Sequence, residues 1–166
     1  MGTDAIVMRH SAEGAPLYAT KAVDPIIINA GDGAHEHPTQ ALLDMYSILE
    51  KKESLEGLKV VIIGDIMHSR VARSNIYGLT KMGADVHLAG PRTMVYPELE
   101  KLGVTVHHDI REAVANADVV NVLRIQLERI HSALYPTNRE YARIFGINNE
   151  VLKLAKDDVM VMHPGP

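Results

Sequence analysis

Short, almost wholly apolar runs alternate along this chain with longer stretches of helical pattern, and this alternation limits the folds that it can adopt. The apolar runs are Asp4–Met8, Pro25–Asn29, Leu58–Ile63, Asp85–Ala89, Val104–His107, Asp118–Leu123 and Val159–Met162. Most of them lack the polar and apolar alternation of a half-exposed strand, so we expect strands that helices cover on both faces. The sequence therefore predicts an α/β protein, a three-layer parallel sheet with helices on both faces.

The segments between these runs carry the pattern of helices. They are Glu13–Ala22, Pro38–Lys52, Val71–Met82, Pro97–Leu102, Ile110–Asn116, Asn138–Phe145 and Asn149–Ala155. In the helix that Pro38 begins, an apolar stripe typical of a helix packed on a core recurs at Leu42, Leu43, Tyr46 and Leu49. The unit before this helix holds two strands and one short helix, too few for a stable layer. This shortage indicates that the chain is a piece of something larger.

The composition is that of an ordinary globular domain, and it excludes several classes of protein. The 166 residues are 46% hydrophobic and 23% charged, which is typical of a single folded domain. A net charge of −4 argues against a nucleic-acid partner. Cysteine is absent, which excludes a disulfide scaffold, a zinc–thiolate site and a cysteine nucleophile. No apolar run reaches the roughly 18 residues of a membrane span, and no signal-peptide pattern begins the chain, so we expect a cytoplasmic location.

Residues 29–40 (NAGDGAHEHPTQ) place a glycine-bearing loop between a predicted strand and a predicted helix. The free backbone N–H groups at such a helix start attract anions. His37 precedes the helix and Gln40 follows three residues later, near the same face, so the two side chains can serve one small anionic ligand. The alternative is that His37 and Gln40 only cap the helix. His35 stands two residues before His37, but no second cluster of acidic or imidazole groups is present, and we predict no metal site.

Arginine and amide side chains follow several of the predicted strands. Arg9 comes after the first apolar run, Arg70 after the third, and Arg124 and Gln126 after the sixth. In an extended chain, Arg124 and Gln126 point to the same side. The carboxyl ends of parallel strands are where α/β sheets bind ligands, and a guanidinium fork suits phosphate or carboxylate. These residues predict a site for a small polyanionic substrate.

The chemistry that such a site supports is group transfer by positioning and electrostatics. No serine–histidine–acid set and no paired carboxylates are evident in the sequence. At the end of the chain, the turn at Pro164 and Gly165 can offer backbone carbonyls to a ligand. Residues 58–70 resemble the opening of a dinucleotide-binding unit, but no G-x-G-x-x-G follows the strand. The interpretation as a dinucleotide-binding unit is therefore weaker than that of a site for a small polyanionic substrate.

Five motifs in this order resemble the catalytic chains of aspartate carbamoyltransferases. They are R-H-S-x-E-G-A, N-A-G-D-G-x-x-x-H-P-T-Q-x-L-L-D, G-D-I-x-H-S-R-V-A-R-S-N, R-I-Q-x-E-R and M-H-P-G-P. The resemblance covers essentially the whole chain. The H-P-T-Q motif is shared with ornithine carbamoyltransferases, whereas R-I-Q-x-E-R and H-P-G-P favour the aspartate enzyme. The resemblance implies carbamoyl transfer from carbamoyl phosphate to L-aspartate in de novo pyrimidine biosynthesis, with no cofactor.

The resemblance also implies a role for each site residue. Arg9 and His37 would contact carbamoyl phosphate, with His37 donating to its carbonyl oxygen. Gln40 would hold the carbamoyl amino group, aided by the carbonyls of the Pro164–Gly165 turn. The two carboxylates of L-aspartate would be bound by Arg70, Arg124 and Gln126.

The family chains are about twice as long as this one, so the resemblance implies a C-terminal fragment. Residues 1–37 would be the remnant of a carbamoyl-phosphate-binding domain, 38–57 a connecting helix and linker, and 58–166 the aspartate-binding domain. The S-T-R-T-R phosphate loop of the family is not in these residues, and we expect the fragment alone to be inactive. The family forms homotrimers, which in some members join regulatory chains or dihydroorotase. A non-catalytic, carbamoyltransferase-like assembly module is the alternative.

The fragment interpretation leaves the first two predicted strands without their sheet partners. The apolar side chains of Ile26, Ile27 and Ile28 would then be exposed, and exposed strand edges pair with other chains. We expect residues 1–36 either to pack irregularly against the following domain or to mediate self-association.

Overall fold

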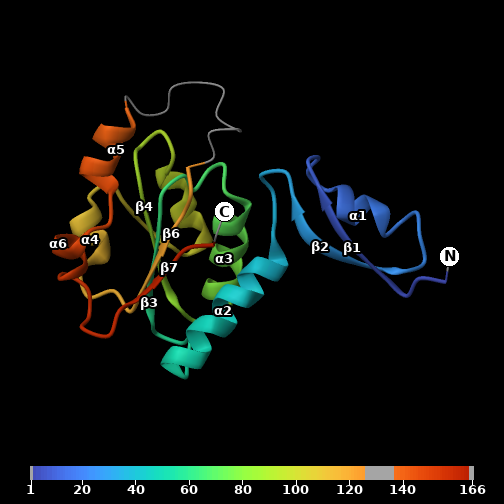
Figure 1. The fold of residues 1–166 in the computed structure, drawn as a ribbon, viewed down its shortest axis with the longest axis horizontal. Coiled ribbons are helices and arrows are strands. Elements are labelled where there is room, and N and C mark those ends of the chain that lie inside the picture. Colours follow the sequence, from blue (N-terminus) through green and yellow to red (C-terminus); the bar gives the residue numbers. More distant parts are fainter. Residues whose placement is uncertain (1, 126–136, 165–166) are drawn as a thin grey trace.

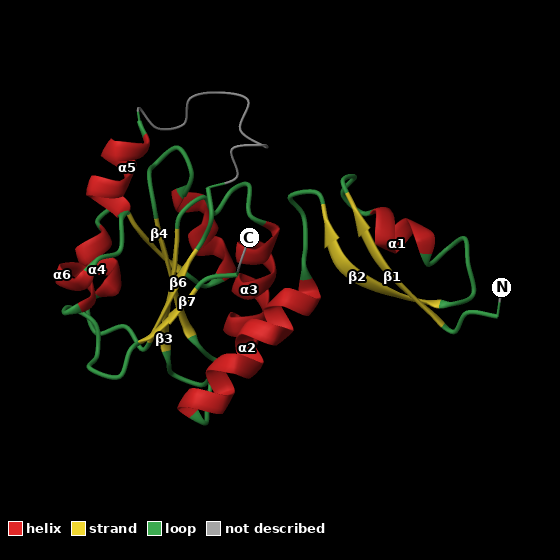
Figure 2. Ribbon diagram, in the orientation of Figure 1, coloured by secondary structure: helices red, strands yellow, loops and turns green. Residues whose placement is uncertain are grey.

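The computed structural model describes residues 2–125 and 137–164, and in these residues two parallel sheets are joined by one long helix (Figures 1 and 2). The small sheet pairs β1 (Ala5–His10) with β2 (Ile26–Asp32). The large sheet has the order β5-β4-β3-β6-β7, and all its pairs are parallel. Its strands are β3 (Lys59–Ile63), β4 (Asp85–Ala89), β5 (Thr105–His107), β6 (Val119–Val122) and β7 (Met160–Met162).

Helices cover both faces of the large sheet, which confirms the predicted three-layer α/β architecture. The helices are α1 (Ala15–Ala19), α2 (Pro38–Lys52), α3 (Arg70–Lys81), the 3₁₀ helix η1 (Pro97–Leu102), α4 (Ile110–Val114), α5 (Asn138–Phe145) and α6 (Asn149–Leu152). Helices α2 and α3 lie on one side of the sheet, and α4 and α6 lie on the other (Figure 1). The short helix α1 rests on the small sheet, away from the large one.

Strand β3 shows why the apolar runs are continuous. Val60 and Ile62 pack into the core that contains the buried residues of α2 and α3, whereas Val61 and Ile63 pack against α4. All four side chains are at most 1% exposed. Because successive side chains in a strand point to opposite faces, a strand that is buried on both faces must be apolar at every position.

The predicted elements are all present, and only their ends differ. Helix α1 is shorter than the predicted Glu13–Ala22, since Gly14 has φ 76° and starts the helix from a left-handed conformation. Helix α3 begins one residue earlier than predicted, at Arg70, because the Ser69 hydroxyl accepts from the Ala72 N–H and caps the helix. Helix α4 ends at Val114, before Asn116 turns to φ 58°.

One prediction about α2 is wrong. The apolar stripe at Leu42, Leu43, Tyr46 and Leu49 does not pack on the core, because these four side chains are 43–62% exposed. The buried face of α2 instead carries Ala41, Asp44 and Ile48, and it lies against α3. A carboxylate in the centre of this face is the reason why an apolar pattern alone points to the wrong side of the helix.

Helix α2 is tied to the large unit at both ends. At its start, the backbone N–H of His37 donates to the Ser74 hydroxyl of α3 over 2.8 Å. In its last turn, the Lys52 ammonium donates to the Asp158 backbone carbonyl and pairs with the Asp158 carboxylate, at 2.6 and 2.7 Å. The contact at His37 places the first turn of α2 beside the first turns of α3.

The small sheet is regular but poorly covered. Its two strands pair in register from Ala5 opposite Ile26 to Met8 opposite Asn29, so the expected irregular packing of residues 1–36 is not observed. Val7 and Ile26 are each 69% exposed, and Ile28 is 38% exposed. The register places these three side chains on one face of the sheet. A two-stranded sheet with an exposed apolar face is not stable by itself in water.

None of the helices in residues 2–125 and 137–164 combines the length and the apolar character that a membrane crossing requires.

We expect the small sheet to drive self-association of the 166-residue chain. Its open edges and its exposed apolar face favour pairing with other chains, so the apparent mass in light scattering should rise with protein concentration. A version that begins at His37 lacks this sheet and should stay monomeric at the same concentrations. The 166-residue chain with Val7→Lys and Ile26→Lys should also lose the association. Monomeric behaviour of the unaltered chain at all concentrations would contradict the prediction.

Candidate functional site

The order of the large sheet creates a crevice where ligands of α/β proteins bind. The chain runs from β3 outward to β4 and β5 and then returns to place β6 on the other side of β3. Crevices at the carboxyl ends of two such strands are the usual ligand sites of open parallel sheets. Arg70 begins α3 after β3, and Arg124 follows β6, so both arginines come from segments that leave the strands at this edge of the sheet.

The end of β7 reaches the same edge of the sheet. The His163 ring Nδ1 lies 2.7 Å from the Val122 carbonyl oxygen at the end of β6, and this contact holds the chain that leads into Pro164. Arg124 is exposed and Pro164 is partly buried. Two of the predicted site residues, Gln126 and Gly165, lie outside the described residues.

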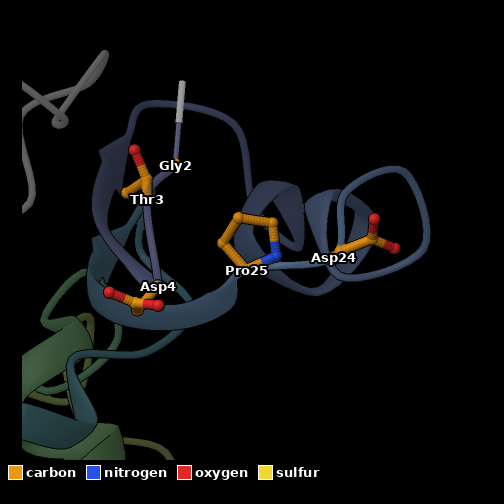
Figure 3. Close-up of a pocket in the computed structure, with 5 residues that line it drawn as sticks. All are labelled: Gly2, Thr3, Asp4, Asp24 and Pro25. Carbon is orange, nitrogen blue, oxygen red and sulfur yellow. The ribbon is translucent and has the colours of Figure 1, made fainter.

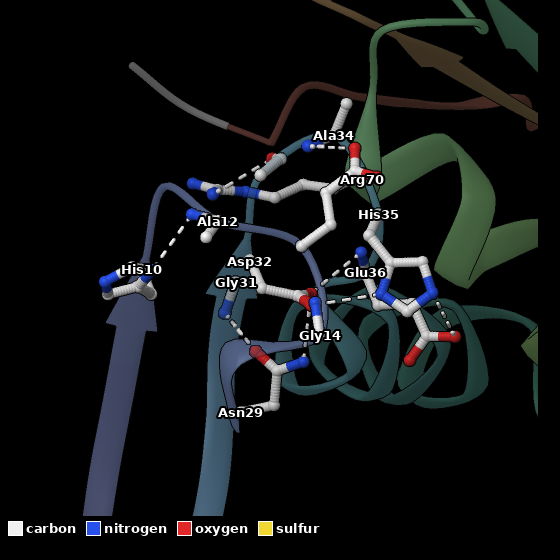
Figure 4. Close-up of polar contacts among 12 residues, drawn as sticks. His10, Ala12, Gly14, Asn29, Gly31, Asp32, Ala34, His35, Glu36 and Arg70 are labelled. Carbon is white, nitrogen blue, oxygen red and sulfur yellow. Dashed lines mark hydrogen bonds and ion pairs between the residues drawn. The ribbon is translucent and has the colours of Figure 1, made fainter. Parts of the chain in front are cut away.

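Arg70 connects the large unit to the loop after β2. Its side chain is almost fully buried, at 8% exposure, and its Nη1 donates to the Gly33 carbonyl over 3.4 Å. The side chain passes so close to Gly31 that a Cβ at that position would lie 2.8 Å from the Arg70 Cζ. Gly31 has φ 113°, which L-residues rarely adopt. The loop therefore needs glycine for its conformation, and a Cβ at this position would displace the guanidinium (Figure 4).

His37 lies at the start of α2, within the electrostatic influence of two arginines. Burial lowers the pKa of His37, and the positive charges of Arg70 and Arg9 lower it further. The ring is therefore neutral at pH 7. Its Nδ1 is 3.2 Å from the Thr39 hydroxyl, and when this hydroxyl donates to Nδ1, the ring proton resides on Nε2. A neutral imidazole of this kind can donate one hydrogen bond to a ligand oxygen.

Gln40 lies in the first turn of α2, and the nitrogen of its side-chain amide makes a hydrogen bond within the protein. Its Nε2 donates to the Asp44 carboxylate over 2.8 Å. His37 is the N-cap residue of α2, but its side chain makes no capping hydrogen bond. Capping by the side chains is therefore not what these two residues provide in this structure. Asp44 was not among the predicted site residues, although a glutamine and an aspartate four residues apart on a helix are a recognisable hydrogen-bonding pair.

The loops after β1 and β2 are held together by one buried carboxylate. Asp32 is 1% exposed; its Oδ2 accepts from the Gly14 N–H at 2.6 Å and lies 3.0 Å from the His35 ring, and its Oδ1 accepts from the Glu36 N–H and the Asn29 side chain (Figure 4). Burial by itself raises the pKa of Asp32, but these hydrogen bonds outweigh it and lower the pKa to about 2. The His35 ring, for which we predict no metal role, is thus occupied by its contact with the Asp32 carboxylate.

A surface hollow elsewhere does not match the predicted ligand. It has a volume of about 450 Å³ and is lined by Gly2, Thr3, Asp4, Asp24 and Pro25 (Figure 3). These residues precede β1 and β2, so the hollow lies at the amino ends of the strands. Its charged groups are two carboxylates, which repel an anion. Within the described part of the chain, no three histidine or acidic side chains gather in a way that could hold a metal ion.

The sequence matches two models of one family, and the chain belongs to the aspartate/ornithine carbamoyltransferase family. Residues 56–166 match its Asp/Orn binding domain, and residues 1–50 match its carbamoyl-P binding domain. Curated relatives at about 60% identity carry the name of the aspartate branch. The chain is 63% identical, over its whole length, to the aspartate carbamoyltransferase catalytic subunit of Ruminiclostridium cellulolyticum, of which it covers 53%. It thus spans about half the length of the curated relatives that it matches.

Solved structures give the same result for the fold. An aspartate transcarbamoylase from Trypanosoma cruzi, in complex with phosphate, superposes with a TM-score of 0.82 at 32% identity, over 98% of this chain and 56% of that one. An ornithine carbamoyltransferase from Pyrococcus furiosus superposes with a TM-score of 0.81 at 31% identity, over 98% of this chain and 54% of that one. The fold is therefore common to both branches, and the identity of about 60% to aspartate carbamoyltransferase catalytic subunits favours the aspartate branch.

We expect Asp32 to stabilise the two loops in a pH-dependent way. A carboxylate whose pKa falls from 3.8 to about 2 on folding contributes stability above pH 4, and this contribution is lost as the pH falls through 2. Asp32→Asn should therefore speed hydrogen exchange at the Gly14 and Glu36 amides by about tenfold or more at pH 7. The exposed Asp24 is the matched control, and Asp24→Asn should leave both amides unchanged. Equal exchange in Asp32→Asn and the unaltered chain would contradict the role of this carboxylate.

Proposed function

We propose that this chain supplies the L-aspartate site and part of the carbamoyl phosphate site of an aspartate carbamoyltransferase. The reaction transfers the carbamoyl group of carbamoyl phosphate to L-aspartate and gives N-carbamoyl-L-aspartate and phosphate, a step of de novo pyrimidine biosynthesis. The observation that carries this proposal is the 2.8 Å hydrogen bond from the His37 N–H to the Ser74 hydroxyl, which holds the start of α2 against α3, the helix that Arg70 begins. The aspartate carbamoyltransferase relatives at about 60% identity support it.

The first substrate would be bound by the start of α2 and the end of β1. Arg9 carries the charge that a phosphate needs, and His37 can donate from Nε2 to the carbamoyl carbonyl oxygen. Gln40 would accept from the carbamoyl amino group, together with carbonyls of the Pro164–Gly165 turn. The hydrogen bond from His37 strengthens as negative charge develops on that oxygen, which stabilises the transition state.

The second substrate would be bound by the groups that follow β3 and β6. Arg70 and Arg124, with Gln126, would hold the two carboxylates of L-aspartate, since a guanidinium fork binds a carboxylate through two parallel hydrogen bonds. The amine of aspartate then attacks the carbamoyl carbon. A C–N bond forms, the C–O bond to phosphate breaks, phosphate leaves, and the amine loses a proton. The arginines contribute by orientation, which shortens the approach of the two reacting atoms.

The domain arrangement of this proposal follows the two sheets. Residues 1–37 would belong to the carbamoyl-phosphate-binding domain, 38–57 would connect, and 58–166 would form the aspartate-binding domain. The family models meet between residues 50 and 56, so they assign most of α2 to the first domain. We further propose a homotrimer in the cytoplasm, with regulatory chains or dihydroorotase as additional partners; the exposed apolar side chains of β1 and β2 support an assembly of this kind.

Two other functions predict different ligands. A carbamoyltransferase-like assembly module without activity would bind neither substrate. A dinucleotide-binding domain would need space for a pyrophosphate at the turn after β3, but Asp65 occupies this turn and is fully buried, with its Oδ1 accepting from the His68 N–H over 3.2 Å. A carboxylate at this place disfavours a bound diphosphate.

We expect titration of the 166-residue chain to separate these functions. The bisubstrate compound N-(phosphonacetyl)-L-aspartate should bind and NAD should not, because the arginines of the crevice match carboxylate and phosphonate groups. The same chain should release no phosphate from carbamoyl phosphate and aspartate, since the family's phosphate loop is not among its residues and each lost donor costs roughly 10²–10³ in rate. Binding of NAD would favour the dinucleotide function, and binding of neither compound would favour the assembly module. Phosphate release by the pure chain would contradict the expected inactivity.

We expect Arg124→Lys to weaken the binding of aspartate selectively in the active enzyme that contains this chain. Lysine keeps the positive charge but cannot form two parallel hydrogen bonds with one carboxylate. The apparent KM for aspartate should rise by about tenfold or more, while the KM for carbamoyl phosphate should stay within about twofold. Arg92→Lys, at an exposed arginine outside the proposed site, is the matched control. Equal losses for both substrates would show that Arg124 does not bind aspartate.

A further inference from the structure

A buried carboxylate lies beneath the proposed carbamoyl phosphate site. Asp44 is 5% exposed and lies on the face of α2 that packs against α3. Its Oδ1 accepts from the Gln40 Nε2 at 2.8 Å, and its Oδ2 accepts from the Asn75 Nδ2 of α3 at 2.6 Å. The Asn121 side chain of β6 also hydrogen-bonds with this carboxylate. Asp44 therefore joins α2, α3 and the central part of the large sheet.

The carboxylate determines which way the Gln40 amide faces. Both oxygens of Asp44 accept from side-chain amide nitrogens, those of Gln40 and Asn75, so the Gln40 amide turns its Nε2 toward Asp44. The amide oxygen, Oε1, is then directed away from Asp44, and no described residue donates to it. The partly exposed Gln40 therefore offers an acceptor, and not a donor, to whatever binds at the start of α2.

We propose that Asp44 is a positioning residue that fixes the Gln40 amide, so that the site accepts a hydrogen bond from a ligand N–H group and selects carbamoyl compounds over acyl compounds. This inference rests on the proposed function and adds a basis for its substrate selectivity. A carbamoyl group ends in NH₂, whereas an acetyl group of the same shape ends in a methyl group. The NH₂ group of a carbamoyl compound can donate a hydrogen bond to Oε1. A methyl group in the same place cannot donate, so it leaves Oε1 without a partner.

A purely structural role explains the Asp44 environment less well. Burial of the carboxylate is costly and raises the pKa of Asp44 despite its hydrogen bonds with Asn75, Gln40 and Asn121. The same cluster leaves two buried amide oxygens, Asn75 Oδ1 and Asn121 Oδ1, without a partner. Apolar side chains at these places would pack α2 on α3 without such costs. The cost of this polar cluster is explained if the cluster serves to orient the Gln40 amide.

A pair of stable ligands tests the selectivity. Phosphonoacetamide carries the NH₂ group, and acetonylphosphonate carries a methyl group in its place. Calorimetric titration of the active enzyme that contains this chain should give a preference of about tenfold for phosphonoacetamide. In Asp44→Ala the amide can rotate, and the preference should fall to within about twofold of unity. The affinity for acetonylphosphonate, which does not use Oε1, should stay nearly constant.

Asn75→Ala is the matched control for stability. It removes the other hydrogen bond of the same carboxylate and leaves the bond between Gln40 and Asp44 in place. Its thermal midpoint should fall, as that of Asp44→Ala does, but its ligand preference should remain that of the unaltered enzyme. Gln40→Ala should remove the preference, and adding Asp44→Ala to it should cause no further change in preference, since Asp44 acts through Gln40.

The outcomes separate this inference from the proposed function. If the unaltered enzyme binds neither ligand, the proposed function fails and the inference fails with it. If it binds both equally, or if Asp44→Ala keeps the preference, only the inference is overturned. Should Asp44→Ala not fold, hydrogen exchange of the Gln40 side-chain amide in the unaltered protein gives the answer. Slow exchange of the proton that faces Asp44, retained when phosphonoacetamide binds, supports the inference, and fast exchange of both protons overturns it.

Discussion

The interaction on which the site depends is the burial of the Arg70 guanidinium between the two sheets. A buried cation must be surrounded by acceptors, because its loss of water is otherwise too costly. Arg70 reaches from the first turn of α3 to the Gly33 carbonyl of the loop after β2. Burial lowers the pKa of His37, and the charge of Arg70 lowers it further. One side chain therefore connects the loops of the two units and helps to keep a histidine at the start of α2 neutral.

Several polar side chains are buried inside the large unit or at its contact with α2, although most of the core is aliphatic. Asp44, Asp65, Ser74, Asn75 and Asn121 are all at most 8% exposed, and three of their atoms have no hydrogen-bond partner. A protein that is optimised for stability alone would place apolar residues there. The concentration of such groups under the carboxyl ends of β3 and β6 indicates that this part of the core serves the orientation of site residues at some expense of stability.

The sequence predicts the sheet well because a strand that is buried on both faces has a local signature, as β3 demonstrates. It does not predict the face of α2 that packs inward, since Asp44 interrupts the apolar pattern and leucines point to solvent. Gln40 and Asp44 are neighbours on one helix, so their contact could have been predicted from their spacing. The Asp32 contacts could not, because Gly14 is 18 residues away and only the paired loops bring it near. The roles of Arg9, His37 and Arg124 toward a ligand stay predictions.

The close approach of Arg70 to Gly31 has an evolutionary consequence. Any side chain at residue 31 would meet the guanidinium at 2.8 Å in addition to an unfavourable φ of 113°. The guanidinium is the far end of a flexible side chain and can shift away from a new Cβ, but such a shift disturbs the contact of Arg70 with the Gly33 carbonyl. The positive φ stays unfavourable for any other residue, whatever stands at residue 70. Drift at this glycine is therefore opposed twice, once by the backbone of the loop and once by the position of the arginine.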